Sequence, residues 1–282
     1  MVIELLGPLW SIYLTVAYLA GSCFGSFLNV CIARWPHDLS VVSPPSRCPR
    51  CEQRIAWHDN VPVFGWLWLR GKCRGCALPI SPQYPLVELL VGLGWLASAW
   101  FYGASLEALR VATFGTVLLG IAVTDAKHYL IPDGFTVSGL ILMLGFALAN
   151  VFIGEPSLFA PLWPAFLGAC AGAGAITLIG WIAEVIMKRE AMGFGDTTLM
   201  AVIGAAVGIE KSLLTIVAGA FVGAVTFVLI VGPILRVRAA RRQQEFAYPE
   251  VPFGVFLAPA ALLVLFWGDA LIAWYLSYVF AI

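Results

Sequence analysis

Charged residues are scarce in this sequence, because Asp, Glu, Lys and Arg together make up only 11% of its 282 residues. Hydrophobic residues make up 61%, in apolar runs along nearly the whole chain, and the mean hydropathy is +0.92. This composition excludes an ordinary water-soluble domain and is typical of a polytopic membrane protein. We therefore expect an all-α fold in contact with the lipid bilayer, because helices satisfy their own backbone hydrogen bonds inside hydrocarbon.

The sequence also lacks the motifs of several common chemistries. It contains no phosphate-binding loop, no Ser-His-Asp order, no Gly-rich Rossmann turn, no internal repeat and no basic patch suited to nucleic acid. We therefore expect no nucleic-acid partner. No basic segment precedes the first apolar run, which is long enough to span a bilayer, so we interpret it as a retained helix and not as a cleavable signal peptide.

The apolar runs predict about eight transmembrane helices. They cover residues 5–31, 85–102, 106–124, 134–153, 161–187, 197–209, 211–235 and 251–278. The sixth run is shorter than the ~20 residues that a bilayer requires. We expect this segment either to tilt into its neighbours together with part of the 193–196 loop, or to be re-entrant.

The basic residues predict the orientation of these helices. If the N-terminus is outside, nearly all Lys and Arg residues fall in inward loops, and only Arg110 and Lys211 remain outside. The positive-inside rule then makes the inward side cytoplasmic.

Two aspartates stand at the edges of apolar runs. Asp196 lies between Gly195 and the sixth run, and Asp125 ends the third run. A charged group near bilayer depth costs ~2.5–3.5 kcal/mol even on lenient scales, so a chain that keeps one usually has a use for it. In the predicted topology both aspartates lie at the cytoplasmic ends of their spans, which indicates a catalytic pair.

A third aspartate, Asp133, lies near the same membrane face. It directly precedes the fourth span, where its carboxylate can cap the helix and complement the helix dipole. Asp125 instead lies where the negative end of a helix dipole disfavours a carboxylate. We therefore expect Asp125, and not Asp133, to be the partner of Asp196.

A polar segment of about 50 residues, 34–84, carries two C-x-x-C pairs, Cys48/Cys51 and Cys73/Cys76, separated by 21 residues. Four thiolates at such a spacing suit a closed tetrahedral Zn²⁺ site, which would stabilise a lobe too small to build its own core. A reducing cytoplasm disfavours disulfides, and the absence of a βαβ pattern disfavours a redox pair. His37 and His58 are not needed as ligands, and we expect both at the surface.

Other residues have simpler interpretations. The small residues near 21–26 and 168–180 predict close helix packing, and we interpret Cys23, Cys31 and Cys170 as small core residues. Glu184 is expected to pair with Lys188. Glu88, early in the second span, is explained equally well by the helix dipole and by a site role, so both interpretations stay open.

Several motifs occur in order between about residues 21 and 260: Gly25-Ser26-Phe27-Leu28-Asn29-Val30, the two C-x-x-C pairs, Tyr84-Pro85-Leu86-Val87-Glu88-Leu89-Leu90, Asp125 with Ile131-Pro132-Asp133, Met192-Gly193-Phe194-Gly195-Asp196, and Pro252-Phe253-Gly254. Together they resemble the type IV prepilin peptidases, which are bifunctional membrane aspartic proteases of the GxGD kind. Thr198 departs from the pattern, since many relatives carry Lys there, and we interpret that position as peripheral to catalysis.

The resemblance implies that the chain cleaves the short basic leader from prepilins or pseudopilins at the cytoplasmic face of the bacterial inner membrane. It also implies N-methylation of the new terminal residue from S-adenosylmethionine, by residues that the sequence leaves unassigned. The resemblance agrees with Asp125 and Asp196 as the catalytic pair. The expected domains are a first transmembrane helix (1–33), a cytoplasmic zinc lobe (34–84) and a transmembrane protease core (85–282).

Two other classes are alternatives. A proton-coupled transporter could use Asp125, Asp196 and Glu88 as a relay, but it would spread its acids across the bilayer and would not need a metal lobe. A zinc-ribbon scaffold for an assembly machine would leave both aspartates replaceable.

Overall fold

The computed structural model describes residues 2–188, 192–236 and 251–280, and within these ranges the chain folds into helices without any named β-strand. The principal helices are α1 (Val2–Arg34), α3 (Gln83–Tyr102), α4 (Leu106–His128), α5 (Asp133–Ile153), α6 (Leu162–Met187), α7 (Phe194–Val207), α8 (Ile209–Thr226) and α10 (Gly254–Phe280). The predicted all-α class is therefore confirmed.

Seven helices among the described residues are long and apolar enough to cross a membrane. They match every predicted span except the sixth, which is the 14-residue helix α7. At about 1.5 Å per residue α7 rises ~21 Å, less than the ~30 Å thickness of the hydrocarbon core. Gly208, at a φ of 83°, ends α7, and α8 begins at the next residue, so a single glycine makes the turn between them.

The helices form two compact units, residues 1–120 and 121–282, and the boundary falls within α4. These units reflect contacts between helices, whereas the domains expected from the sequence, 1–33, 34–84 and 85–282, reflect composition and motifs. That finer division stays a prediction.

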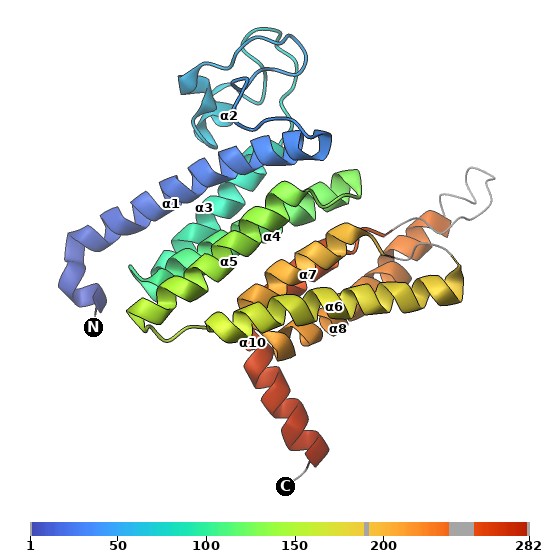
Figure 1. Cartoon of the computed structure of the whole chain (residues 1–282). Helices are drawn as coiled ribbons and strands as arrows, with labels where there is room; N and C mark the ends of the chain where they lie inside the picture. The colour runs from blue at the N-terminus through green and yellow to red at the C-terminus, as the bar shows by residue number, and fades with distance from the viewer. Residues whose placement is uncertain (1, 189–191, 237–250, 281–282) are drawn as a thin grey trace. The chain divides into compact units, whose positions relative to one another are not determined.

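In the first unit α1 packs lengthwise along α3 (Figure 1). A Cβ atom on Gly25 would lie 2.7 Å from the Cα of Glu88, and one on Gly21 would lie 2.6 Å from the Cβ of Trp95. Any larger residue at these two positions would push the helices apart. The prediction of close packing around residues 21–26 is therefore confirmed.

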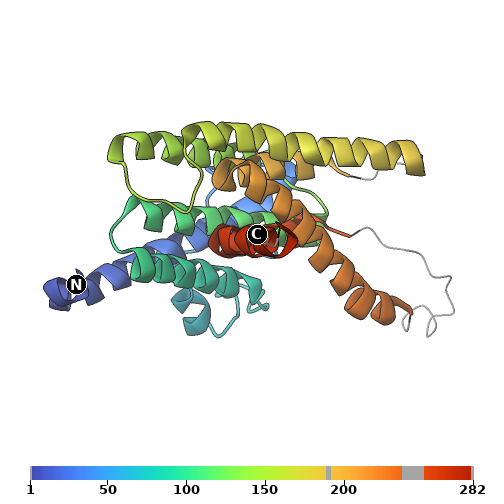
Figure 2. The same ribbon diagram turned by 90° about the horizontal axis from the view of Figure 1, so that it is seen from below.

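In the second unit α6 lies beside α7, and α8 packs against α10 (Figures 1 and 2). Gly168 of α6 and Gly204 of α7 approach so closely that a Cβ atom on either would overlap the carbonyl oxygen of the other. A Cβ atom on Gly172 would lie 2.6 Å from the carbonyl oxygen of Met200. The glycine-rich stretch of α6 thus permits the contact that the sequence predicts.

The expectation that three cysteines outside the C-x-x-C pairs are core residues is right for only one of them. Cys31 is 1% exposed, but Cys23 and Cys170 are exposed on α1 and α6. Since these helices are apolar on nearly every side, their sequences do not indicate which side packs against protein.

The two basic residues expected on the outer side both have acidic neighbours. The Nζ atom of Lys211 donates a 2.7 Å hydrogen bond to Asp269. Arg110 is 1% exposed, and its guanidinium lies 4.0 Å from the carboxylate of Glu107.

The expected ion pair between Glu184 and Lys188 does not occur among the ion pairs of the described residues. The backbone N–H of Lys188 instead donates to the carbonyl of Glu184, where α6 ends with Lys188 in the left-handed region. Some basic residues used for the predicted orientation lie outside the described residues, namely Arg189, Arg238, Arg241 and Arg242.

Candidate active site and metal centre

Asp125 lies in the last turn of α4 and is 5% exposed. The backbone N–H of Val255, in the first turn of α10, donates a 3.2 Å hydrogen bond to its Oδ2 atom. A helix N-terminus has free N–H groups and a positive dipole end, so it stabilises a carboxylate at this position. The start of α10 therefore offsets the unfavourable dipole that the end of α4 imposes on Asp125.

Asp196 lies in the first turn of α7, after Gly193 at the N-cap position. Its backbone N–H donates to the carbonyl of Gly193 at 3.1 Å, and its side chain is half-buried. Gly195, which directly precedes Asp196, and Gly254, which lies beside the carboxylate of Asp125, both pack against Ile131. The second unit thus brings together two acids that are 71 positions apart in the chain.

Ile131 fixes the positions of the segments that carry these acids. It lies between α4 and α5 and is 6% exposed. A Cβ atom on Gly195 would lie 2.8 Å from the Cβ of Ile131, and one on Gly254 would lie 3.1 Å from its Cδ1 and 2.8 Å from the Oδ2 of Asp125. Gly195 and Gly254 are therefore the two glycines whose missing side chains let α7 and α10 approach the end of α4.

Asp133 is placed differently from the other two aspartates. It is the first residue of α5 and is exposed, whereas Asp125 is buried and Asp196 is half-buried. No side-chain hydrogen bond caps the start of α5, where Pro132 is the N-cap residue. The expected role of Asp133 is thus limited to its favourable position at the positive end of the helix dipole.

The four cysteines of the C-x-x-C pairs come together in the lobe between α1 and α3. Their Sγ atoms all lie within 4.8 Å of one another, and the Cys48–Cys76 and Cys51–Cys73 separations are both 3.9 Å. A tetrahedral Zn²⁺ site with Zn–S bonds of about 2.3 Å requires sulfur separations of about 3.8 Å. The donor set therefore fits a tetrahedral metal ion, and none of the four thiols is in a disulfide.

The two C-x-x-C pairs adopt the same backbone turn. In the first, Cys48 N–H donates to Gln53 and Glu52 N–H donates to Cys48. In the second, Cys73 N–H donates to Leu78 and Ala77 N–H donates to Cys73. The fifth residue of each turn, Glu52 or Ala77, has a φ of 57°. This repetition indicates that each pair presents its sulfurs in the same way, as two halves of one site.

Backbone and side-chain contacts support the cysteine site. Backbone N–H groups of Cys51 and Arg50 lower the pKa of Cys48 to about 6. At Cys51 the Gln53 N–H lowers the pKa, but burial and hydrogen bonds to the other three thiols outweigh it and raise the pKa to about 11. Cys48 is therefore the cysteine whose thiolate, the form that a metal ion binds, is favoured before any metal is present. Arg74, inside the second pair, donates two hydrogen bonds to Asp59, of 2.7 and 2.5 Å. This ion pair holds the pKa of Asp59 below its usual range and ties the second turn to the segment after the first.

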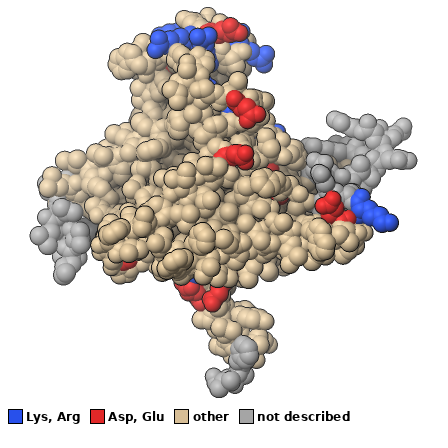
Figure 3. Space-filling view, viewed as in Figure 1, with Lys and Arg blue, Asp and Glu red and all other residues tan. Residues whose placement is uncertain are grey.

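Charged side chains are concentrated at the surface of the lobe (Figure 3). Figure 3 shows Lys, Arg, Asp and Glu atoms gathered on the lobe, whereas the visible face over the helices is mostly uncharged. His37 and His58 are both exposed, as expected, and neither belongs to the cysteine group.

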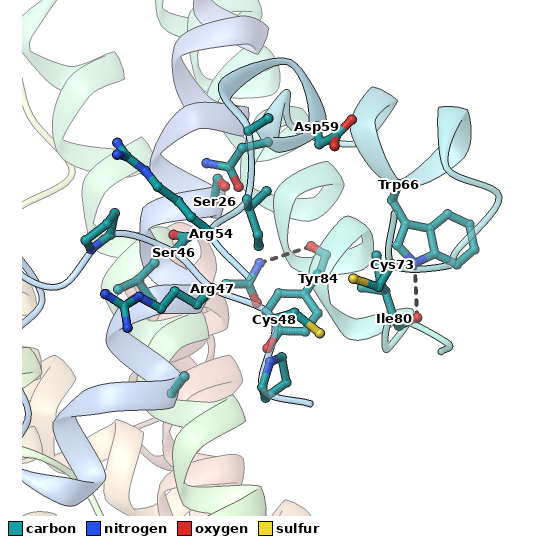
Figure 4. A pocket seen from close by; sticks show the side chains of 18 of the residues that line it. Ser26, Ser46, Arg47, Cys48, Arg54, Asp59, Trp66, Cys73, Ile80 and Tyr84 are labelled. Carbon is teal, nitrogen blue, oxygen red and sulfur yellow. Dashed lines mark hydrogen bonds between the residues drawn. The ribbon is translucent and has the colours of Figure 1, made fainter. Parts of the chain in front are cut away.

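A cavity of about 790 Å³ lies between the end of α1, the lobe and the start of α3. Ser26, Asn29 and Glu88 are among the residues that line it, and Cys48 and Cys73 lie on its lobe side (Figure 4). The sequence marks Asn29 and Glu88 as polar residues in apolar surroundings, but it does not indicate that they share a cavity with the lobe.

Two family models match the chain. The Bacterial Peptidase A24 N-terminal domain matches residues 19–102, and the Type IV leader peptidase family matches residues 112–228. No solved structure matches significantly.

Curated relatives named "Prepilin leader peptidase/N-methyltransferase" match nearly the whole chain. The protein of Myxococcus xanthus is 34% identical over 92% of this chain and 79% of the relative. The protein of Aeromonas hydrophila is 34% identical over 98% of both chains, and that of Stutzerimonas stutzeri is 34% identical over 94% of both.

Proposed function

Because the chain belongs to the type IV leader peptidase family, we propose that Asp125 and Asp196 are the carboxyl groups with which it cleaves its substrate. The enzyme is a prepilin leader peptidase with N-methyltransferase activity, which is the activity that its relatives' names give. The observation that carries the residue assignment is the packing of Gly195, next to Asp196, and of Gly254, next to the carboxylate of Asp125, against the same side chain, Ile131. Nothing in the comparisons favours the transporter alternative.

Peptide hydrolysis by two carboxyl groups requires them to share one proton. The ionised carboxylate takes a proton from water as the water attacks the scissile carbonyl, and the protonated carboxyl donates to the carbonyl oxygen. When the tetrahedral intermediate breaks down, a proton passes to the leaving nitrogen. In this scheme the backbone N–H groups of Val255 and Gly254 at the start of α10 hold the carboxyl group of Asp125 in place.

The substrates are proposed to be prepilins or pseudopilins, with the basic leader on the cytoplasmic side. A protease within a membrane suits such substrates, because their leader precedes an apolar helix that resides in the bilayer. The proposed location is the bacterial inner membrane, with the N-terminus outside and both the lobe and the aspartate pair facing the cytoplasm. The positive-inside asymmetry of the loops supports this orientation.

The proposed metal is one structural Zn²⁺ ion bound by Cys48, Cys51, Cys73 and Cys76. With all four positions taken by thiolates, such a site leaves no open coordination for substrate and acts by holding the lobe together. The lobe has no fully buried hydrophobic side chain between residues 35 and 82, so a metal ion would supply stability that packing does not.

The proposed methyl donor is S-adenosylmethionine, which supplies an electrophilic methyl group to the amine of the new N-terminus. The two carboxyl groups at the ends of α4 and α7 suit hydrolysis and leave the binding of this donor to another part of the chain. The cavity below the lobe has room for a molecule of this size, because cavities of ~300–1,000 Å³ hold drug-sized ligands.

One experiment tests both activities together. The purified enzyme is incubated in detergent with a prepilin and S-adenosylmethionine, and the mass of the pilin's new N-terminal peptide is measured. Loss of the leader together with a gain of one methyl group is expected. An intact leader after prolonged incubation with folded enzyme would contradict the proposed substrate class.

A further inference from the structure

The cavity below the lobe is built entirely from the first unit of the chain. It lies where α1 ends and α3 begins, and the lobe covers it. In Figure 4, Ser26 and Arg54 lie on one side of the cavity, and Trp66, Cys73 and Ile80 lie on the other. Side chains of several kinds, acidic, basic and aromatic, therefore surround one space of about 790 Å³.

Glu88 is an acid without a cationic partner at this cavity. It is 8% exposed, and its Oε2 accepts a 2.7 Å hydrogen bond from the backbone N–H of Val63. The hydroxyl of Ser26 is its other hydrogen-bonding neighbour. None of the ion pairs among the described residues involves Glu88, although one of them, between Arg74 and Asp59, also lies at this cavity. A carboxylate buried without a counter-ion attracts a cationic ligand, because the attraction is strong where water is excluded.

The side-chain oxygen of Asn29 is a second hydrogen-bond acceptor at this cavity, and no group among the described residues donates to it. It is 3% exposed, and its Nδ2 donates a 3.0 Å hydrogen bond to the carbonyl of Tyr84, drawn as the dashed line that ends at Tyr84 in Figure 4. Since a carbonyl can only accept, this bond fixes the orientation of the amide. The Oδ1 atom is then left buried without a hydrogen-bond partner. Native structures rarely leave such an atom unpaired unless it has a further role.

The rim of the cavity has the opposite character. Arg47, Arg50 and Arg54 all line the cavity from the lobe, and all three are exposed. Guanidinium groups bind carboxylates through paired hydrogen bonds. The cavity therefore offers acceptors at its base and cations at its rim, which suits a ligand with a positive centre and a separate carboxylate.

We propose that this cavity binds S-adenosylmethionine, with its sulfonium toward Glu88 and Asn29 and its carboxylate toward the rim arginines. The inference rests on the proposed function, since it assigns the site at which the N-methyltransferase takes its methyl donor. The residues that line this site all fall within 23–88, which belongs to the first unit, whereas Asp125 and Asp196 belong to the second.

The charge change of the reaction fits such a site. The lone pair of the substrate's amine forms the new N–C bond to the methyl carbon as the C–S bond breaks, and the electron pair of the broken bond stays on sulfur. The nitrogen then loses one proton to solvent. The sulfonium thereby becomes the neutral thioether of S-adenosylhomocysteine, so a carboxylate at the base favours the donor over the spent product.

A binding measurement tests the proposal without relying on activity. Equilibrium dialysis of the purified enzyme is carried out with S-adenosylmethionine and, in a parallel arm, with S-adenosylhomocysteine. We expect wild type to bind the cationic donor about tenfold more tightly than the neutral product, and Glu88→Gln to lose this preference. Gln keeps an oxygen that can accept the Val63 N–H, so the variant should fold. Arg54→Gln should weaken both ligands, which share the carboxylate.

The matched control is Glu184→Gln, which removes an exposed acid from α6, outside the cavity. It should bind both ligands as wild type does. Equal preference in Glu88→Gln and wild type, or no binding by a wild-type preparation that still cleaves prepilin, would overturn the assignment.

Photo-crosslinking of radiolabelled S-adenosylmethionine to the wild-type enzyme, followed by peptide mapping, decides the matter if Glu88→Gln does not fold. Label is expected within residues 23–88, and label found only within 121–282 would contradict the proposal. Failure of the proposed function has a different signature, because a wild-type enzyme that binds the donor in this cavity but leaves prepilin uncleaved would contradict the function and not the donor site.

Discussion

The Oδ2 atom of Asp125 accepts a hydrogen bond from the backbone N–H of Val255, 130 positions further along the chain. The first turn of α10 thus stabilises an acid at the end of α4, where α4 alone would disfavour it. The same contact requires glycine at position 254, since a Cβ atom there would lie 2.8 Å from that oxygen. The proposed catalytic pair therefore depends on three helices, of which only α4 and α7 carry its acids.

The first prediction concerns the identity of the pair. Asp125→Asn and Asp196→Asn should each reduce prepilin cleavage by ~10²–10⁴-fold or to background, because an amide cannot transfer the shared proton. Asp133→Asn should retain much of the activity, since Asp133 is exposed at the start of α5. Cleavage is measured on purified variants with wild-type melting behaviour. Substantial cleavage by Asp125→Asn alongside an inactive Asp133→Asn would move the pair to Asp133 and Asp196.

The second prediction concerns Gly254. Gly254→Ala should greatly reduce cleavage, because the added methyl group would displace the carboxylate of Asp125. Gly115→Ala is the control. Gly115 lies on the same helix as Asp125, and a Cβ atom at this position would have no atom of the described residues within 4 Å beyond those of its own stretch of helix. Cleavage rates of the two variants, compared at equal folded concentration, provide the check. Full activity in Gly254→Ala would show that the position of this oxygen does not matter.

The third prediction concerns the metal. Purified enzyme should contain about one zinc ion per chain, bound by the four cysteines of the lobe. Metal analysis measures the content, and alkylation with N-ethylmaleimide measures protection of the thiols. The same four thiols, alkylated after removal of the metal by a chelator and unfolding in denaturant, serve as references. A zinc content near zero, with all four lobe thiols alkylated as fast as these references, would refute the site.

The fourth prediction is that the two activities separate. Asp196→Asn should abolish cleavage yet leave methylation of a pre-cleaved substrate largely intact, because the proposed donor cavity lies within residues 23–88. Incorporation of a labelled methyl group into mature pilin is the measurement. Equal loss of both activities in a folded variant would argue for one shared site.

The fifth prediction concerns the contact between α6 and α7. Gly168→Ala should destabilise the protein by roughly 1–3 kcal/mol or more, because its Cβ atom would overlap the carbonyl of Gly204. Gly174→Ala in the same helix meets nothing within 4 Å and should stabilise the protein by ~0.5–1 kcal/mol. Thermal unfolding in detergent compares the two variants. A stability order opposite to this one would mean that α6 and α7 do not meet at these glycines.

The sequence by itself determined the helical class and the apolar segments, and it selected the residues that are proposed to carry chemistry. Apolar runs of about 20 residues have few alternatives to membrane helices. An acid in such a chain costs free energy in the bilayer, so its presence indicates a role. Two C-x-x-C pairs at this spacing are specific enough to indicate a metal site. For this reason residue types and spacing alone are enough to select Asp125, Asp196 and the four lobe cysteines. The sequence also indicates that α7 is short, because the helix lies between Gly193 and Gly208, which are only 15 positions apart.

Only the tertiary structure decided which surfaces meet. Cys31 is buried while Cys23 is exposed on the same helix, and Glu88 reaches the lobe through the backbone of Val63. Neither fact follows from local sequence, because in helices that are apolar on nearly every side the pattern of hydrophobic residues does not distinguish a protein-facing side from a lipid-facing one. The contact of Val255 with Asp125 was hidden for a related reason: it is made by a backbone N–H, which every residue except proline possesses, so its position depends on how the helices pack and not on side-chain identity.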